Sequence, residues 1–87
     1  MNEFEILAEL IGIPDLKTQN RNQVNSTARQ AISFLLHKKG FSAEEIGVMQ
    51  GRNRTTIIHQ IKTFRQFLDC EDEMALKFWR KINPDCQ

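Results

Sequence analysis

The sequence predicts an all-α protein, a small bundle of about five helices that contains a helix-turn-helix. Apolar residues recur at intervals of three and four along most of the chain, which is the period of amphipathic helices. Glycines follow three of these periodic segments, and glycine is the residue that most easily adopts the conformation ending a helix. With 87 residues the chain has material for one hydrophobic core, so we expect a single domain over residues 1–87.

The first periodic segment lies at the N-terminus. Its apolar residues are Phe4, Leu7, Ala8 and Ile11. Their spacing predicts a helix over residues 3–11, which should end at Gly12. Pro14 can open a short turn that extends to residue 17. Residues 18–25 are polar and are expected to form a loop that carries Arg21.

A second, longer helix is predicted after this loop. Ser26 or Thr27 can cap its N-terminus, and Gly40 should follow its end. Its apolar stripe consists of Ala28, Ala31, Ile32, Leu35 and Leu36. Arg29 and Gln30 then fall near the first turn, where free backbone amides favour an anion such as phosphate.

The third and fourth helices make the helix-turn-helix, at about residues 43–69. Ser42 and Glu45 have the spacing of a capping box, so a short helix should begin at residue 43 and end at Gly51. Asn53 can cap the longer helix that follows. The apolar residues of this longer helix share one side: Ile57, Ile61, Phe64 and Leu68. A short helix, a tight glycine-containing turn and a long helix form the DNA-reading motif.

The last helix is expected at about residues 72–82. Its apolar stripe comprises Ala75, Leu76, Trp79 and Ile82. Asn83 and Pro84 should end it, because a residue before proline disfavours helical geometry. Trp79 is predicted to lie in the core.

The fourth helix has a polar face suited to DNA. Its polar residues away from the apolar stripe are Thr55, His59, Lys62 and Gln66. Arg52 and Arg54 stand at its N-terminal tip, where the helix dipole also favours phosphate. Arginine can bind the O6 and N7 atoms of guanine, and threonine can contact thymine. We therefore expect this tip to enter the major groove of double-stranded DNA.

The charge distribution agrees with a nucleic-acid ligand, although the net charge is only +1. Between residues 16 and 68 there are nine basic and two acidic residues, a local net charge of +7. The other nine acidic residues lie in the two flanking segments. A concentrated positive field is what binding to phosphates requires. Segregated surface charge without a ligand is the alternative interpretation.

Other classes of protein find little support in the sequence. No apolar run approaches the thickness of a bilayer and no targeting segment opens the chain, so a cytoplasmic, nucleoid-associated protein without membrane partner is expected. Cys70 and Cys86 do not have metal-ligand spacing and are expected to be buried or idle thiols, so no metal is predicted. His37 and His59 have neither a nucleophile nor a carboxylate at a recognisable spacing, and no enzyme is predicted.

The stretch from residue 27 to 61 resembles the C-terminal DNA-binding domain of the bacterial chromosomal replication initiator DnaA. That family has an arginine-glutamine pair in a long helix, an isoleucine-glycine pair in the short helix, and a glycine-arginine-aspartate-histidine-threonine-threonine run before a later histidine. The matching segments here are Arg29-Gln30, Ile46-Gly47 and Gly51-Arg52-Asn53-Arg54-Thr55-Thr56, with His59 after them. The resemblance implies a Trp-repressor-like fold.

The resemblance also implies roles for individual residues. Arg54, Thr55 and Asn53 match positions that contact bases in the major groove, and Arg21 falls where the family has its minor-groove arginine. Residues expected at or near the DNA backbone are Arg29, Gln30, Arg52, Thr56, His59 and Lys62. The implied function is sequence-specific binding of double-stranded DNA, related to the recognition of replication-origin boxes.

Two departures from the family affect this expectation. Asn53 and Arg54 replace the family's aspartate and histidine, which predicts a different target sequence. The loop that carries Arg21 has asparagine and glutamine in place of several arginines, which predicts weaker general affinity. The chain contains no phosphate loop, so neither a nucleotide cofactor nor ATPase activity is expected. A protein-interaction module with a partner in replication or regulation, and a transcriptional regulator of a mobile element, are the alternatives.

Overall fold

A computed structural model describes residues 2–13 and 23–83, and this part of the chain consists of helices joined by short turns. The helices are α1 (Glu3–Ile11), α2 (Gln23–Lys38), α3 (Ala43–Gln50), α4 (Arg54–Asp69) and α5 (Glu73–Ile82). The described residues form no strand. The predicted all-α bundle of about five helices is confirmed.

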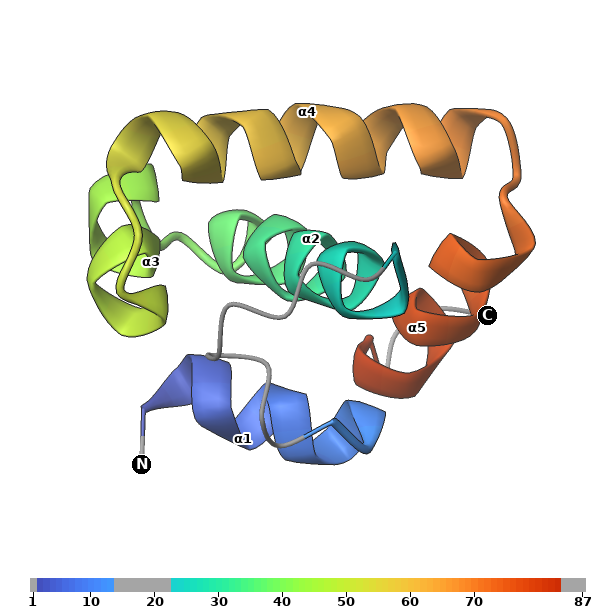
Figure 1. Ribbon diagram of the computed structural model, residues 1–87, viewed down its shortest axis with the longest axis horizontal. Coiled ribbons are helices and arrows are strands. Elements are labelled where there is room, and N and C mark those ends of the chain that lie inside the picture. Colours follow the sequence, from blue (N-terminus) through green and yellow to red (C-terminus); the bar gives the residue numbers. More distant parts are fainter. Residues whose placement is uncertain (1, 14–22, 84–87) are drawn as a thin grey trace.

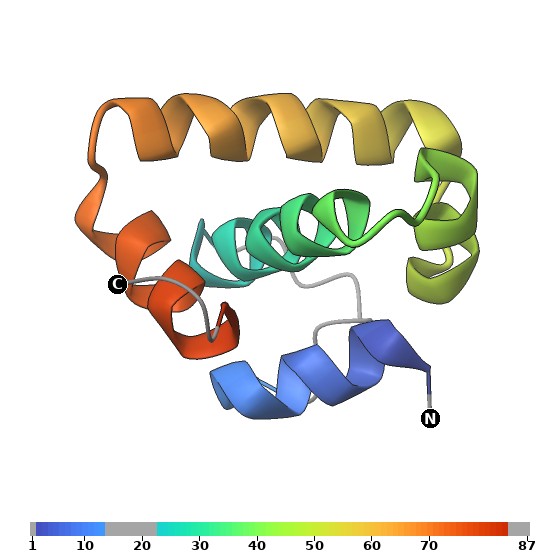
Figure 2. The ribbon, with the colours of Figure 1, turned by 180° about the vertical axis from the view of Figure 1, so that it is seen from behind.

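Helix α2 lies at the centre of the bundle and contacts the other four helices (Figure 1). Helix α4 runs along one side of α2, and α1 lies on the opposite side. Helices α3 and α5 lie at the two ends, as the view from behind also shows (Figure 2). This arrangement places the N-terminus of α4 beside α3, at the end of the molecule remote from α5.

Local capping signals explain where most helices begin and end. At α3, Glu45 N–H donates to Ser42 Oγ at 3.1 Å, and Ser42 N–H donates to Glu45 Oε1 at 2.9 Å. This reciprocal pair is the predicted capping box. Asn2 and Glu5 make a second capping box at α1, and Gly12 ends that helix with φ of 95°. The predicted first helix, over residues 3–11, is confirmed.

The predicted start of α2 is wrong. The helix begins at Gln23, so Ser26 and Thr27 lie inside it, and the last three residues of the predicted loop are helical. Asn25 and Thr27 are buried, and packing of these side chains favours helix over the local capping alternative. The expected turn after Pro14 and the position of Arg21 lie outside the described residues.

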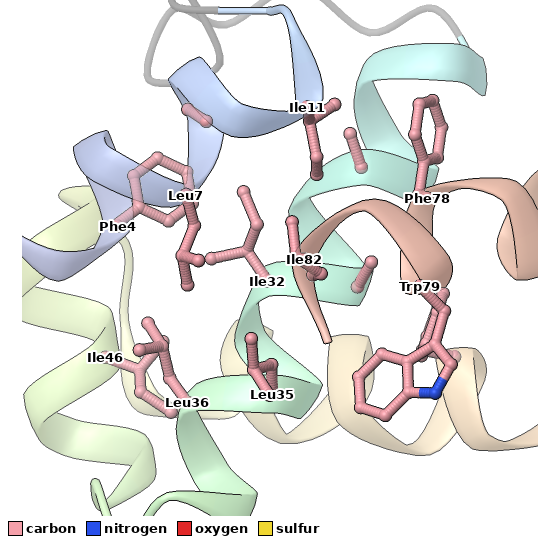
Figure 3. Close-up of a cluster of buried hydrophobic side chains, with 14 of the residues drawn as sticks. Phe4, Leu7, Ile11, Ile32, Leu35, Leu36, Ile46, Phe78, Trp79 and Ile82 are labelled. Atoms are coloured by element: carbon pink, nitrogen blue, oxygen red, sulfur yellow. The ribbon is translucent and has the colours of Figure 1, made fainter. Parts of the chain in front are cut away.

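The core forms where α1, α2, α3 and α5 meet, and α4 contributes two further buried residues (Figure 3). The predicted stripe of α2 is buried throughout: Ala28, Ala31, Ile32, Leu35 and Leu36. In α4, Ile57 and Phe64 are fully buried, whereas Ile61 and Leu68 are partly buried. In α5, Trp79 is buried as expected, and Phe78 is a buried residue that the sequence stripe omitted. The periodic pattern therefore located the core.

Three aromatic rings join α2, α4 and α5. The ring of Phe34 lies 5.5 Å from that of Phe64 and 5.2 Å from that of Trp79, between centroids. The rings of Phe64 and Trp79 are 5.8 Å apart. Separations and tilts of this kind are favourable for aromatic pairs. Trp79 is the single tryptophan of the chain, so its fluorescence reports on this packing.

Two further expectations concern thiols and membranes. Cys70 is an exposed free cysteine whose Sγ lies 2.8 Å from the carbonyl oxygen of Gln66, so the expectation of a buried thiol is wrong there. Cys86 lies outside the described residues. Among residues 2–13 and 23–83, no helix combines the length and apolar character needed to cross a membrane.

Candidate nucleic-acid interface

The turn between α3 and α4 is built on two glycines. Gly51 ends α3 with φ of 72°, a left-handed conformation that glycine adopts without steric cost. Gly47 lies one turn earlier, and its carbonyl oxygen accepts a 2.9 Å hydrogen bond from Arg52 N–H. A Cβ atom on residue 47 would be 2.6 Å from the carbonyl oxygen of Arg52. Glycine at position 47 therefore lets the turn fold back against α3.

Asn53 begins α4 as the sequence predicts. Its backbone is extended, and its Oδ1 accepts a 2.8 Å hydrogen bond from Thr56 N–H. This bond satisfies one of the backbone amides that a helix N-terminus leaves free. The amide nitrogen Nδ2 is the part of the Asn53 side chain that this cap does not use.

The N-terminal tip of α4 is exposed. Arg54 and Thr55 are both exposed, as is Asn53. The polar face predicted behind them is exposed along the helix at His59, Lys62 and Gln66. A solvent-open hollow of about 210 Å³ lies on this face, lined by Thr55, Ile58, His59 and Lys62. The surface that must meet a groove is thus free of covering side chains from the described residues.

A second hollow, which we call the arginine pocket, lies beside this tip between α2 and α4. Its volume is about 230 Å³, and its lining residues are Ser26, Arg29, Gln30, Arg52, Thr56 and Gln60. Two arginines and four neutral polar residues line it, with no carboxylate among them. The pocket thus gathers positive charge next to the first turn of α4.

Arg29 occupies the inner part of the arginine pocket. Its side chain is 6% exposed, and its Nη2 donates a 3.4 Å hydrogen bond to Ser26 Oγ. Burial lowers the pKa of the Arg29 guanidinium, and the positive charge of Arg52 lowers it further. Both effects disfavour the charged form of Arg29, so an anion placed between the two arginines would offset them.

Two buried polar atoms at the pocket have no hydrogen-bond partner within the described part of the chain. They are Nε of Arg52 and Oε1 of Gln30. Buried polar atoms without partners are rare in folded proteins and indicate sites where another molecule completes the bonding. Nε of Arg52 is a donor, which suits a phosphate oxygen.

The structure brings most of the predicted site residues into one region. Asn53, Arg54 and Thr55 form the tip; Arg29, Gln30, Arg52 and Thr56 line the arginine pocket; His59 and Lys62 extend along α4. The placement of Arg29 differs from the prediction, since it is buried and lies in the second turn of α2 rather than near free amides. Arg21 is outside the described residues.

Sequence reasoning missed a buried polar cluster beneath the tip, formed by Ser33, Gln50 and Gln60. Ser33 is 0% exposed, Gln50 2% and Gln60 8%. Each lies three or four residues from buried apolar residues of its own helix, as Gln60 does from Ile57 and Phe64. A polar residue within an apolar stripe is the signal that could have found this cluster.

The exposed helix tip, the tight turn and the adjacent arginine pocket define a DNA-binding helix-turn-helix domain. The chain belongs to the family described as the bacterial DnaA protein helix-turn-helix, whose model matches residues 5–63. The matched segment runs from α1 through the first ten residues of α4 and includes the whole turn and tip. No curated protein and no solved structure matches the chain.

Proposed function

We propose that this chain binds double-stranded DNA with sequence preference, by inserting the N-terminal tip of α4 into the major groove. The observation that carries the proposal is the position of Arg54 and Thr55, which are exposed at the first turn of α4 beside the arginine pocket. Base edges are accessible in the major groove to side chains at a helix tip. The binding unit is taken as a single domain over residues 1–87.

The residues at the tip are assigned to base contacts. Arg54 offers two donors to the O6 and N7 atoms of a guanine, and Thr55 offers a hydroxyl and a methyl group. Because Oδ1 of Asn53 accepts the capping bond from Thr56, Nδ2 is the group with which Asn53 would contact a base acceptor. Arg21, on the segment before α2, is assigned to the minor groove.

The arginine pocket is assigned to a DNA phosphate. Arg52 and Arg29 supply the charge, and Gln30 and Thr56 lie on the pocket wall. A phosphate there would sit against the first turn of α4, where the helix dipole also favours an anion. His59 and Lys62 lie farther along α4 and are assigned to the DNA backbone. Phosphate contacts of this kind fix the register in which the tip meets the bases.

The target sequence is proposed to differ from that of the initiator family. Asn53 and Arg54 stand where the family has aspartate and histidine, and these are base-contacting positions. An arginine in place of histidine changes the donor pattern presented to the groove. Binding is proposed to require no nucleotide and to involve no ATP hydrolysis, because no phosphate loop occurs in the sequence.

The test is selection from randomised duplexes followed by a salt titration. The selected duplex, an initiator-type box and shuffled controls are each titrated with the protein between about 50 and 200 mM salt. The proposal expects a salt-dependent affinity that is at least tenfold higher for the selected duplex than for its shuffled form. Equal affinity for all duplexes would contradict it. Salt-independent or absent DNA binding, with a stable protein partner, would favour an interaction module instead.

A further inference from the structure

The three residues of the buried polar cluster come from three different helices. Ser33 lies in the middle of α2, Gln50 is the last residue of α3, and Gln60 lies in the second turn of α4. The two glutamine amides are paired: Gln50 Nε2 donates to Gln60 Oε1 and Gln60 Nε2 donates to Gln50 Oε1, each at 3.1 Å. Gln50 Nε2 also donates to Ser33 Oγ, which itself donates to Gln60 Oε1, each at 2.5 Å. The cluster is therefore a closed set of mutual hydrogen bonds.

The cluster is located where the DNA-facing parts of the molecule meet. Gln50 directly precedes Gly51, so its buried side chain holds the start of the turn. Gln60 follows Thr56 by one helical turn and also lines the arginine pocket. One side chain thus contacts the proposed phosphate pocket on one side and the other two helices on the other.

Hydrogen bonding among these three residues constrains geometry more tightly than apolar packing would. Hydrogen bonds weaken steeply away from linear geometry, so sliding or rotation of α4 over α2 and α3 would break several of them together. Apolar side chains tolerate such shifts, and cores lose a unique arrangement before they lose stability. An apolar replacement of the whole cluster is expected to remain folded, since no buried group would be left without a partner.

We infer that Ser33, Gln50 and Gln60 are positioning residues, which set the angle and register of α4 against α2 and α3 and thereby determine sequence preference. This inference rests on the proposed function. None of the three side chains is assigned to a DNA base. Their effect is exerted through the position of Arg54 and Thr55, which a displaced helix would present to different base edges.

The test is a triple variant in which the cluster becomes apolar, Ser33→Ala with Gln50→Leu and Gln60→Leu. Its fold is checked by far-UV circular dichroism and by thermal unfolding followed through Trp79 fluorescence. The expected result is a folded protein whose affinity for shuffled duplex stays within about threefold of the unmodified protein. Its preference for the selected duplex over the shuffled one is expected to fall at least tenfold, a free-energy change of about 1.4 kcal/mol.

A second readout needs no DNA. Spin labels are placed at exposed positions of α3 and α4 through Val48→Cys and Gln66→Cys, with Cys70 and Cys86 replaced by serine. The distance distribution between the labels is expected to broaden or shift in the triple variant. The matched control is Ile82→Val, which shortens a buried side chain on α5 and should alter neither the distance distribution nor the preference.

The outcomes separate this inference from the proposed function. An unchanged distance distribution in the triple variant would overturn the positioning role, whatever the unmodified protein does with DNA. A changed distribution with the sequence preference retained within twofold would overturn the link between helix position and specificity. If the unmodified protein showed no preference, the proposed function and this link would both fail, whereas the distance measurement would still test the positioning itself.

Discussion

The amide nitrogen of Arg52 donates a 2.9 Å hydrogen bond to the carbonyl oxygen of Gly47, and the carbonyl oxygen of Arg52 lies 2.6 Å from where a Cβ on residue 47 would be. Because that neighbour is backbone, it can move only if the turn moves. Arg52 leads directly into the helix tip formed by Asn53, Arg54 and Thr55. A single missing side chain in α3 therefore determines how closely the DNA-facing turn approaches the bundle.

Replacing Gly47 with alanine should destabilise the protein. In an unobstructed helix this change would stabilise by about 1 kcal/mol, because alanine has the higher helix propensity. Here the steric conflict with Arg52 should outweigh that gain and lower the free energy of unfolding by about 1 to 3 kcal/mol. Urea unfolding followed by Trp79 fluorescence measures the difference. Val48→Ala, at an exposed neighbouring position, is the control and should stay within about 0.5 kcal/mol. An increase in stability for Gly47→Ala would contradict the account.

Glu71 offers a stabilising substitution between α4 and α5. It has φ of 56°, a left-handed conformation that costs a side-chain-bearing residue roughly 1 to 2 kcal/mol. Asp72 N–H donates to Phe67 O at 2.9 Å and Glu71 N–H to Leu68 O at 3.1 Å, so hydrogen bonds hold this conformation. Glu71→Gly should raise the free energy of unfolding by about 0.5 to 1 kcal/mol. Glu71→Ala removes the same charge but keeps the strain, and an equal gain for both variants would refute the explanation.

Asn53 has two separable roles, as a helix cap and as a base-contacting residue. Asn53→Ala should cost about 1 kcal/mol of stability, because Thr56 N–H loses its acceptor. Asn53→Ser and Asn53→Asp retain a capping oxygen and should preserve stability in thermal unfolding. Asn53→Asp should nevertheless change the duplex selected from a randomised pool, since its side chain has no donor. An unchanged selected sequence would remove Asn53 from the base-contacting set.

Arg52→Gln tests the arginine pocket. Loss of one phosphate contact should reduce the slope of log affinity against log salt by about 0.9. Loss of that charge should also move the pKa of Arg29 back toward its ordinary value, so stability without DNA should not fall through electrostatics. Arg80→Gln removes an exposed positive charge from α5, at the other end of the bundle, and should leave the slope unchanged. Equal slopes for both variants would argue against a phosphate in the pocket.

Signals confined to a few adjacent residues were sufficient to predict much of the fold. The capping pair Ser42 and Glu45, the cap Asn53 and the terminal Gly51 each act within one turn of helix, and each lies where its local chemistry requires. The apolar stripes located the core for the same reason, since their spacing is a property of each helix alone. The exposed face of α4 followed as the complement of its stripe.

What depends on contacts between helices was not predicted. Ser26 and Thr27 are good caps in isolation, yet α2 begins three residues before the first of them. Arg29 carries a charge that composition alone would place at the surface, and only the proximity of α2 to the turn buries it. The partners of Ser33, Gln50 and Gln60 are 10 to 27 residues apart in the chain, so their pairing follows from the packing of three helices.

The most direct test of the central claim compares Arg54→Ala with Lys62→Ala on the selected duplex and on its shuffled form at one salt concentration. If the tip of α4 reads bases, Arg54→Ala should cost about 1 to 3 kcal/mol of binding free energy on the selected duplex and much less on the shuffled one. Lys62→Ala should weaken binding to both duplexes by a similar factor. If Arg54→Ala instead weakened both duplexes equally, Arg54 would be a phosphate contact and base reading by this tip would be contradicted.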